Sequence, residues 1–136
     1  MAGMAAKVVE AFFEAQDTKP TIINDSLLRV GWNFEGGSIS IFFDFDEDDA
    51  HVHLEGLEYI TVPADKYDKI YPVLNEVNGQ YRLVKFVLDT ENGSICAKLD
   101  AVIQLDSCGP ECFELMIRMV KIVEGAYPVF MKALWA

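Results

Sequence analysis

Four carboxylates in the middle of the chain have the spacing of a calcium-binding loop. Asp44, Asp46, Asp48 and Glu55 occupy relative positions 1, 3, 5 and 12, where EF-hand loops place oxygen ligands. The match is incomplete, because position 6 is Asp49 where the sharp turn requires glycine, and strand-like runs flank the segment in place of helices. Two alternatives remain: a cation site on these four residues, and a solvated hairpin tip that associates only weakly with divalent ions.

Two histidines follow the acidic run. His51 and His53 are one residue apart on a predicted strand, so their side chains point to the same face. With Asp49 or Glu55 nearby they could form a zinc or nickel site, which needs three or four converging ligands. The alternative is a pair of exposed histidines on the polar face of an alternating strand, and the period-2 pattern favours this second interpretation.

Two of the three cysteines enclose a short motif, Cys108-Gly109-Pro110-Glu111-Cys112, which is a thioredoxin-type motif with one residue inserted. At the start of a helix, a thiol pKa would be lowered by the helix terminus. The alternative places Cys108 in an ordinary loop and Cys112 on the apolar side of the helix. An odd number of cysteines without a signal sequence fits a reducing cytoplasm.

Other catalytic signatures are missing from the sequence. His51 and His53 are the only histidines, and there is no nucleophile-elbow, phosphate-loop or dinucleotide-binding motif. The sequence therefore predicts a protein that is not an enzyme and that carries no cofactor.

The charge is unevenly distributed. The net charge is -11, and nine of the 22 acidic residues but none of the 11 basic residues lie between Arg29 and Lys66. This balance argues against nucleic acid as a partner, because phosphate binding needs clustered lysine and arginine. A hydrophobic content of 51% excludes a disordered acidic tail, and no apolar run is long enough to predict a membrane span. We expect one soluble domain over residues 1–136, with an acidic side.

Apolar periodicity predicts an α+β domain with the element order α-β-β-β-α-β-β-α. The opening segment has the spacing of an amphipathic helix, residues 18–25 form a connection, and three strands of an antiparallel meander follow at 27–34, 39–45 and 51–62. Gly56 inside the third strand predicts a bulge or a close approach of the backbone. A helix kinked or split at Pro72 runs from 64 to 79, a hairpin covers 82–89 and 94–105, and Pro110 begins the last helix. That helix has an apolar seam of Phe113, Met116, Val120, Val123, Tyr127, Phe130 and Leu134.

Three short motifs carry a resemblance to a known family. Leu74–Asn78 (LNEVN) leads into Leu83–Phe86 (LVKF), and Tyr127-Pro128 lies near the end of the last helix. The sequence resembles the YbjN-like family, described as bacterial sensory transduction regulators, whose fold is similar to that of type III secretion chaperones. The resemblance implies one antiparallel sheet packed with helices, a dimer in many members, and no reaction.

The apolar residues exceed what one helical layer covers. Phe42 lies on one face of the second strand, and Phe43 and Phe45 lie on the other, so both faces of the sheet require apolar contacts. The helix after Pro63 is the candidate dimer surface, partly because the chaperones that the sequence resembles pair through that region. Its candidate interface residues are Tyr67, Ile70, Tyr71 and Leu74.

These observations favour a cytoplasmic, homodimeric, non-enzymatic domain that binds a protein or peptide partner of unknown identity, as a regulatory or chaperone-like adaptor. The alternative is a domain that senses a small ligand or a divalent metal ion through the segment from Asp44 to Glu55. Neither nucleic acid nor a membrane is expected as a partner.

Overall fold

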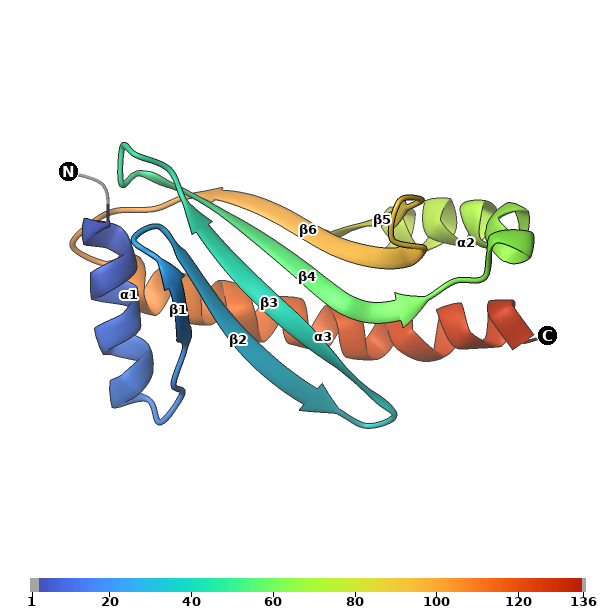
Figure 1. The fold of residues 1–136 in the computed structure, drawn as a ribbon, viewed down its shortest axis with the longest axis horizontal. Coiled ribbons are helices and arrows are strands. Elements are labelled where there is room, and N and C mark those ends of the chain that lie inside the picture. Colours follow the sequence, from blue (N-terminus) through green and yellow to red (C-terminus); the bar gives the residue numbers. More distant parts are fainter. Residues whose placement is uncertain (1–2, 136) are drawn as a thin grey trace.

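The computed structural model describes residues 3–135, which form an α+β domain of three α-helices and a six-stranded sheet (Figure 1). The predicted fold class is confirmed. None of the described helices is both long and apolar enough to cross a membrane. The elements are α1 Met4–Ala15, β1 Thr21–Asn24, β2 Leu27–Phe34, β3 Gly37–Phe45, β4 His51–Thr61, the 3-10 turn η1 Ala64–Lys66, α2 Tyr67–Gln80, β5 Lys85–Asp89, β6 Ser94–Val102 and α3 Cys108–Trp135.

The sheet is antiparallel throughout, with strand order β1-β2-β3-β4-β6-β5, so β1 and β5 are its edges. The prediction that residues 18–25 form only a connection was wrong, because Thr21–Asn24 pairs with β2. All four residues of β1 are exposed, so the segment has no buried face to produce an alternating pattern. Pairing with β2 stabilises it instead.

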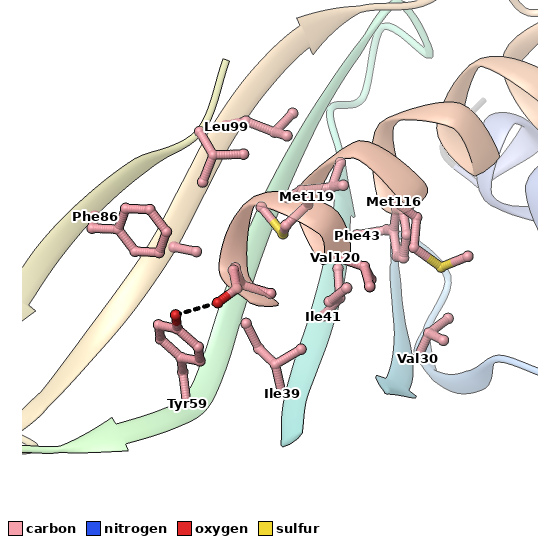
Figure 2. Close-up of a cluster of buried hydrophobic side chains, with 14 of the residues drawn as sticks. Val30, Ile39, Ile41, Phe43, Tyr59, Phe86, Leu99, Met116, Met119 and Val120 are labelled. Carbon is pink, nitrogen blue, oxygen red and sulfur yellow. Dashed lines mark hydrogen bonds between the residues drawn. The ribbon is translucent and has the colours of Figure 1, made fainter. Parts of the chain in front are cut away.

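The long helix α3 runs the length of the molecule along one face of the sheet (Figure 1). Helix α1 lies near the N-terminal end of α3, and α2 lies near the C-terminal end of α3. No described helix covers the opposite, outer face. Side chains of β3 and α3 interdigitate between the two layers, as Figure 2 shows for Ile41, Phe43, Met116 and Val120. The seam predicted for α3 faces the core, where Phe113 and Tyr127 are partly buried and the others are buried: Met116, Val120, Val123, Phe130 and Leu134.

A bulge interrupts the pairing of β4 with β6. The pairing of β4 with β6 shifts register between Gly56 and Ile60, and Glu58 adopts a positive φ of 57° within this segment. A Cβ at Gly56 would lie only 2.5 Å from Cδ1 of Ile39. The predicted close approach of the backbone at Gly56 is therefore confirmed, since only glycine leaves room for Ile39 there.

The prolines leave their helices continuous. Pro72 lies inside α2, and no break separates its two halves. Pro110 does not begin α3, because the helix starts two residues earlier, at Cys108. Backbone N–H groups in the first turn of a helix have no partner within the helix, so a proline there removes no hydrogen bond. Pro128 also lies within continuous helix, in α3.

Candidate functional site

The turn between β3 and β4 gathers three candidate metal ligands. One ligand atom from each of Asp46, Asp48 and His51 lies within 4.8 Å of the other two, and all three residues are exposed. Asp48 Oδ2 is 2.7 Å from His51 Nδ1, and Asp48 Oδ1 accepts a hydrogen bond from the Ala50 backbone N–H. That backbone hydrogen bond, followed by the contact with His51, lowers the pKa of Asp48 below its usual value.

The other two predicted calcium ligands lie elsewhere. Asp44 is on β3, where its Cα partner is His53 of β4. Glu55 forms an ion pair with Lys98, at 3.3 Å between Oε2 and Nζ. The antiparallel ladder holds both residues on strands, so the structure brings Asp46 and Asp48 together with His51 and not with Asp44 or Glu55.

The predicted common face of the two histidines is confirmed. His51 and His53 lie on the outer face of the sheet, and the residue between them, Val52, is buried on the inner face. His53 Nδ1 is 2.7 Å from Asp100 Oδ1 on β6. Both histidines line a shallow hollow of about 250 Å³ together with Asp46 and Asp100. Asp100 was missed from the sequence because it comes from a strand 47 residues further along the chain.

The cysteine motif is part of the core. Cys108 and Cys112 are both free and buried, and Cys108 begins α3 rather than lying in a loop. The expectation of a lowered thiol pKa was wrong: burial raises the pKa of Cys108, and burial raises the pKa of Cys112 to about 12. Desolvation of the thiolate outweighs the effect of the helix terminus, so both thiols are protonated at neutral pH and neither is an activated nucleophile.

The candidate interface residues on α2 are divided between core and surface. Ile70 and Leu74 are buried within the chain itself, whereas Tyr67 is partly buried and packs against the core. Tyr71 is 49% exposed. Of the four, only Tyr71 is therefore exposed enough to contact a partner, with about half of its surface accessible.

The edge strand β1 exposes two large apolar side chains. Ile22 is 55% exposed and Ile23 is 48% exposed. A hollow of about 200 Å³ lies between β1 and α1, lined by Ile22 and Leu28 on one side and by Ala6 and Glu10 on the other. Sequence reasoning missed this surface because it placed residues 18–25 outside the sheet; the adjacent isoleucines were the available signal.

The opposite edge of the sheet is closed at its centre. Asn78 of α2 donates a hydrogen bond from Nδ2 to the carbonyl oxygen of Phe86 on β5, at 2.9 Å. The backbone N–H of Phe86 donates one to Asn78 Oδ1, at 2.7 Å. The amide group thus occupies the positions that a neighbouring strand would use. Within residues 3–135, no side-chain amide closes the outer edge of β1 in this way.

A family model named YbjN, with the description "Putative bacterial sensory transduction regulator", matches residues 5–122. No curated protein sequence matches the chain.

Solved structures show the same fold. YbjN from E. coli, described as "a putative transcription regulator", has a TM-score of 0.65 at 9% identity, and the match covers 90% of this chain and 91% of that one. The ExsC–ExsE complex has a TM-score of 0.63 at 14% identity, and the match covers 96% of this chain and 96% of that one. The ExoU–SpcU complex from the type III secretion system of Pseudomonas aeruginosa has a TM-score of 0.57 at 15% identity, and the match covers 93% of this chain and 97% of that one. The chain thus has a type III secretion chaperone-like fold.

Proposed function

This chain belongs to the YbjN family, and we propose that it works as a non-enzymatic adaptor that binds an extended segment of another protein along β1. The observation that carries the proposal is the open edge of β1 with its exposed Ile22 and Ile23. Unpaired backbone groups on an edge strand are a template for another strand, and exposed apolar residues beside them provide binding energy.

The mode of binding would be addition of a strand. Backbone hydrogen bonds to β1 supply affinity for any extended chain, and the hollow between α1 and β1 selects the side chains that fit. The closed edge of β5, where Asn78 pairs with Phe86, directs the partner to β1. The similar structures of ExsC with ExsE and of ExoU with SpcU are complexes between proteins, which supports a protein partner.

Charge substitution on β1 tests the proposal. The full chain, its Ile22→Lys/Ile23→Lys variant and a Val87→Lys control are used to capture proteins from the native cell. Val87 is also an exposed apolar residue on an edge strand, β5. The proposal requires a reproducible partner that the β1 variant loses and the control retains, together with slowed amide hydrogen exchange of residues 21–24 in the complex. A partner that binds the β1 variant as well as the unaltered chain contradicts it.

We also propose that the adaptor is a homodimer, with the exposed Tyr71 on α2 as a contact residue. Large aromatic side chains are enriched at such interfaces. Sedimentation equilibrium of the unaltered chain and of Tyr71→Asp checks this: a dimer that the substitution dissociates is expected, and a monomer in both cases refutes the proposal.

A cytoplasmic location completes the proposal. The three cysteines are all free, and each is buried, which suits a reducing compartment. Fractionation of the native cell followed by immunodetection of the chain measures its location, and recovery from an oxidising compartment would contradict it.

A second candidate function is divalent-ion sensing through Asp46, Asp48 and His51, whose ligand atoms lie within 4.8 Å of one another. An imidazole with two carboxylates suits zinc or nickel better than calcium, which prefers oxygen ligands alone. Isothermal titration with zinc, nickel and calcium chloride tests it. Binding of zinc or nickel that Asp46→Asn/Asp48→Asn abolishes and Asp65→Asn preserves supports the site, whereas no heat with any of the three ions excludes it.

A further inference from the structure

A second exposed surface lies at the end of β6, far from β1 in the sheet order. Val102 is the last residue of β6, and at 68% its exposed fraction is the largest among the described large apolar residues. Its Cα partner on β4 is His51. A branched apolar side chain in this position is exposed without contributing to the core, so its burial by a partner would be favourable.

Two hollows meet at Val102. The first, of about 250 Å³, lies toward His51, His53 and Asp100 on the outer face of the sheet. The second, of about 420 Å³, lies toward the first turns of α3. Ala101 and Val102 line both hollows, so the two adjoin at the end of β6, and we call them together the β6–α3 corner. Its members toward α3 are Pro110, Glu111, Glu114 and Leu115.

The corner has an apolar centre and an acidic rim. Carboxylates line both hollows, with Asp46 and Asp100 in the first and Glu111 and Glu114 in the second, and no lysine or arginine lines either one. Two rim carboxylates have a basic partner: His53, in the lining, lies 2.7 Å from Asp100, and Arg118, outside the lining, forms an ion pair with Glu114 at 2.7 Å. The surface therefore attracts positive charge, and its low basic content disfavours an acidic partner.

We infer that the β6–α3 corner binds a basic segment of a partner protein, with one apolar side chain seated against Val102 and flanking lysine or arginine residues facing the rim. An aliphatic anchor surrounded by charge pairs is a common arrangement of an interface, with the apolar contact supplying affinity and the charges setting orientation. This inference rests on the proposed protein-binding function, and it adds a site and a partner chemistry that the β1 edge does not provide.

Short fluorescein-labelled peptides provide the test. The probe has a central leucine flanked by lysines; one matched peptide replaces the leucine with serine, and another replaces the lysines with glutamates. Binding to the full chain is measured by fluorescence anisotropy. We expect the leucine–lysine peptide to bind most tightly, and we expect added salt to weaken its binding because Asp46, Asp100 and Glu114 of the rim are exposed.

Variants locate the binding. Val102→Asp should weaken the leucine–lysine peptide by about tenfold or more, since it places a charge at the apolar centre. Val87→Asp, at an exposed valine outside both hollows, should leave affinity unchanged. Asp46→Asn/Asp100→Asn removes two rim charges without changing side-chain size and should reduce both the affinity and its salt dependence.

Several results would overturn the inference. They are failure of the leucine–lysine peptide to bind, equal affinity for the unaltered chain and Val102→Asp, or loss of binding in the Ile22→Lys/Ile23→Lys variant alone. A homodimer that Val102→Asp dissociates would assign the corner to a second copy of the chain and would also overturn it. If peptides do not bind while a native partner is lost with the β1 variant, the inference fails and the proposed function stands.

Discussion

The side-chain amide of Asn78 pairs with both backbone groups of Phe86, accepting a hydrogen bond from its N–H at 2.7 Å and donating one to its carbonyl oxygen at 2.9 Å. This pair joins the last turns of α2 to the edge strand β5 and closes that edge. The asparagine that ends the LNEVN segment therefore has a structural role, which is to cover the edge of β5.

Replacement of Asn78 by alanine should destabilise the fold. It removes both hydrogen bonds and leaves the Phe86 backbone groups without these partners, which costs about 1–3 kcal/mol. The free energy of unfolding in urea measures the effect. Asn75→Ala is the control, because Asn75 is exposed on the same helix. Equal losses in the two variants would show that the Phe86 contact contributes nothing specific.

A side chain at Gly56 should clash with Ile39. Gly56→Ala places a Cβ 2.5 Å from Ile39 Cδ1, and overpacking of this kind costs about 1–3 kcal/mol. Ile39→Val removes Cδ1, so the double variant should recover part of the loss in a double-mutant cycle. Gly31→Ala is the matched control, because nothing lies within 4 Å of a Cβ at that position. Strict additivity of the Gly56 and Ile39 substitutions would refute the predicted clash.

Alkaline pH should destabilise the fold through Cys112. Burial raises the pKa of this thiol from 9.0 to about 12, so above pH 9 the unfolded chain releases a proton that the folded chain retains. The stabilisation is complete below pH 9 and is lost as the pH rises toward 12. Urea unfolding across this range should show a smaller pH dependence for Cys112→Ala than for the unaltered chain. If the free energy of unfolding depends on pH equally in Cys112→Ala and the unaltered chain, the Cys112 thiol is not the cause.

The hydroxyl of Tyr59 should contribute to the docking of α3. It donates a hydrogen bond to the Val123 carbonyl oxygen at 2.5 Å, within the buried layer between β4 and α3 (Figure 2). Tyr59→Phe keeps the ring and removes this bond, so we expect a loss of about 1 kcal/mol in the free energy of unfolding. Tyr71→Phe alters an exposed tyrosine and should have no measurable effect on the monomer. An unchanged free energy of unfolding in Tyr59→Phe would show that this hydrogen bond to the Val123 carbonyl oxygen does not stabilise the fold.

Local patterns were sufficient for most elements. An apolar and aromatic run followed by turn residues identified β2 at its observed bounds. The seam from Phe113 to Leu134 identified α3, because a buried face imposes its period on the residues that form it. Gly56 was recognised for a similar reason, since glycine inside a strand marks a place where another group approaches closely.

The surfaces required the tertiary structure. No periodicity marks β1, because all four of its residues are exposed, and pairing with β2 alone makes it a strand. Strand register places Asp100 beside His53 and Val102 beside His51, although each pair is far apart in the sequence. Burial likewise decided the state of the Cys108 and Cys112 thiols. The sequence by itself determined the order of the helices and of strands β2 to β6, and the acidic character of the chain, because these depend on neighbouring residues. Only the tertiary structure decided which edge is open and which charges meet, because both depend on contacts between distant segments.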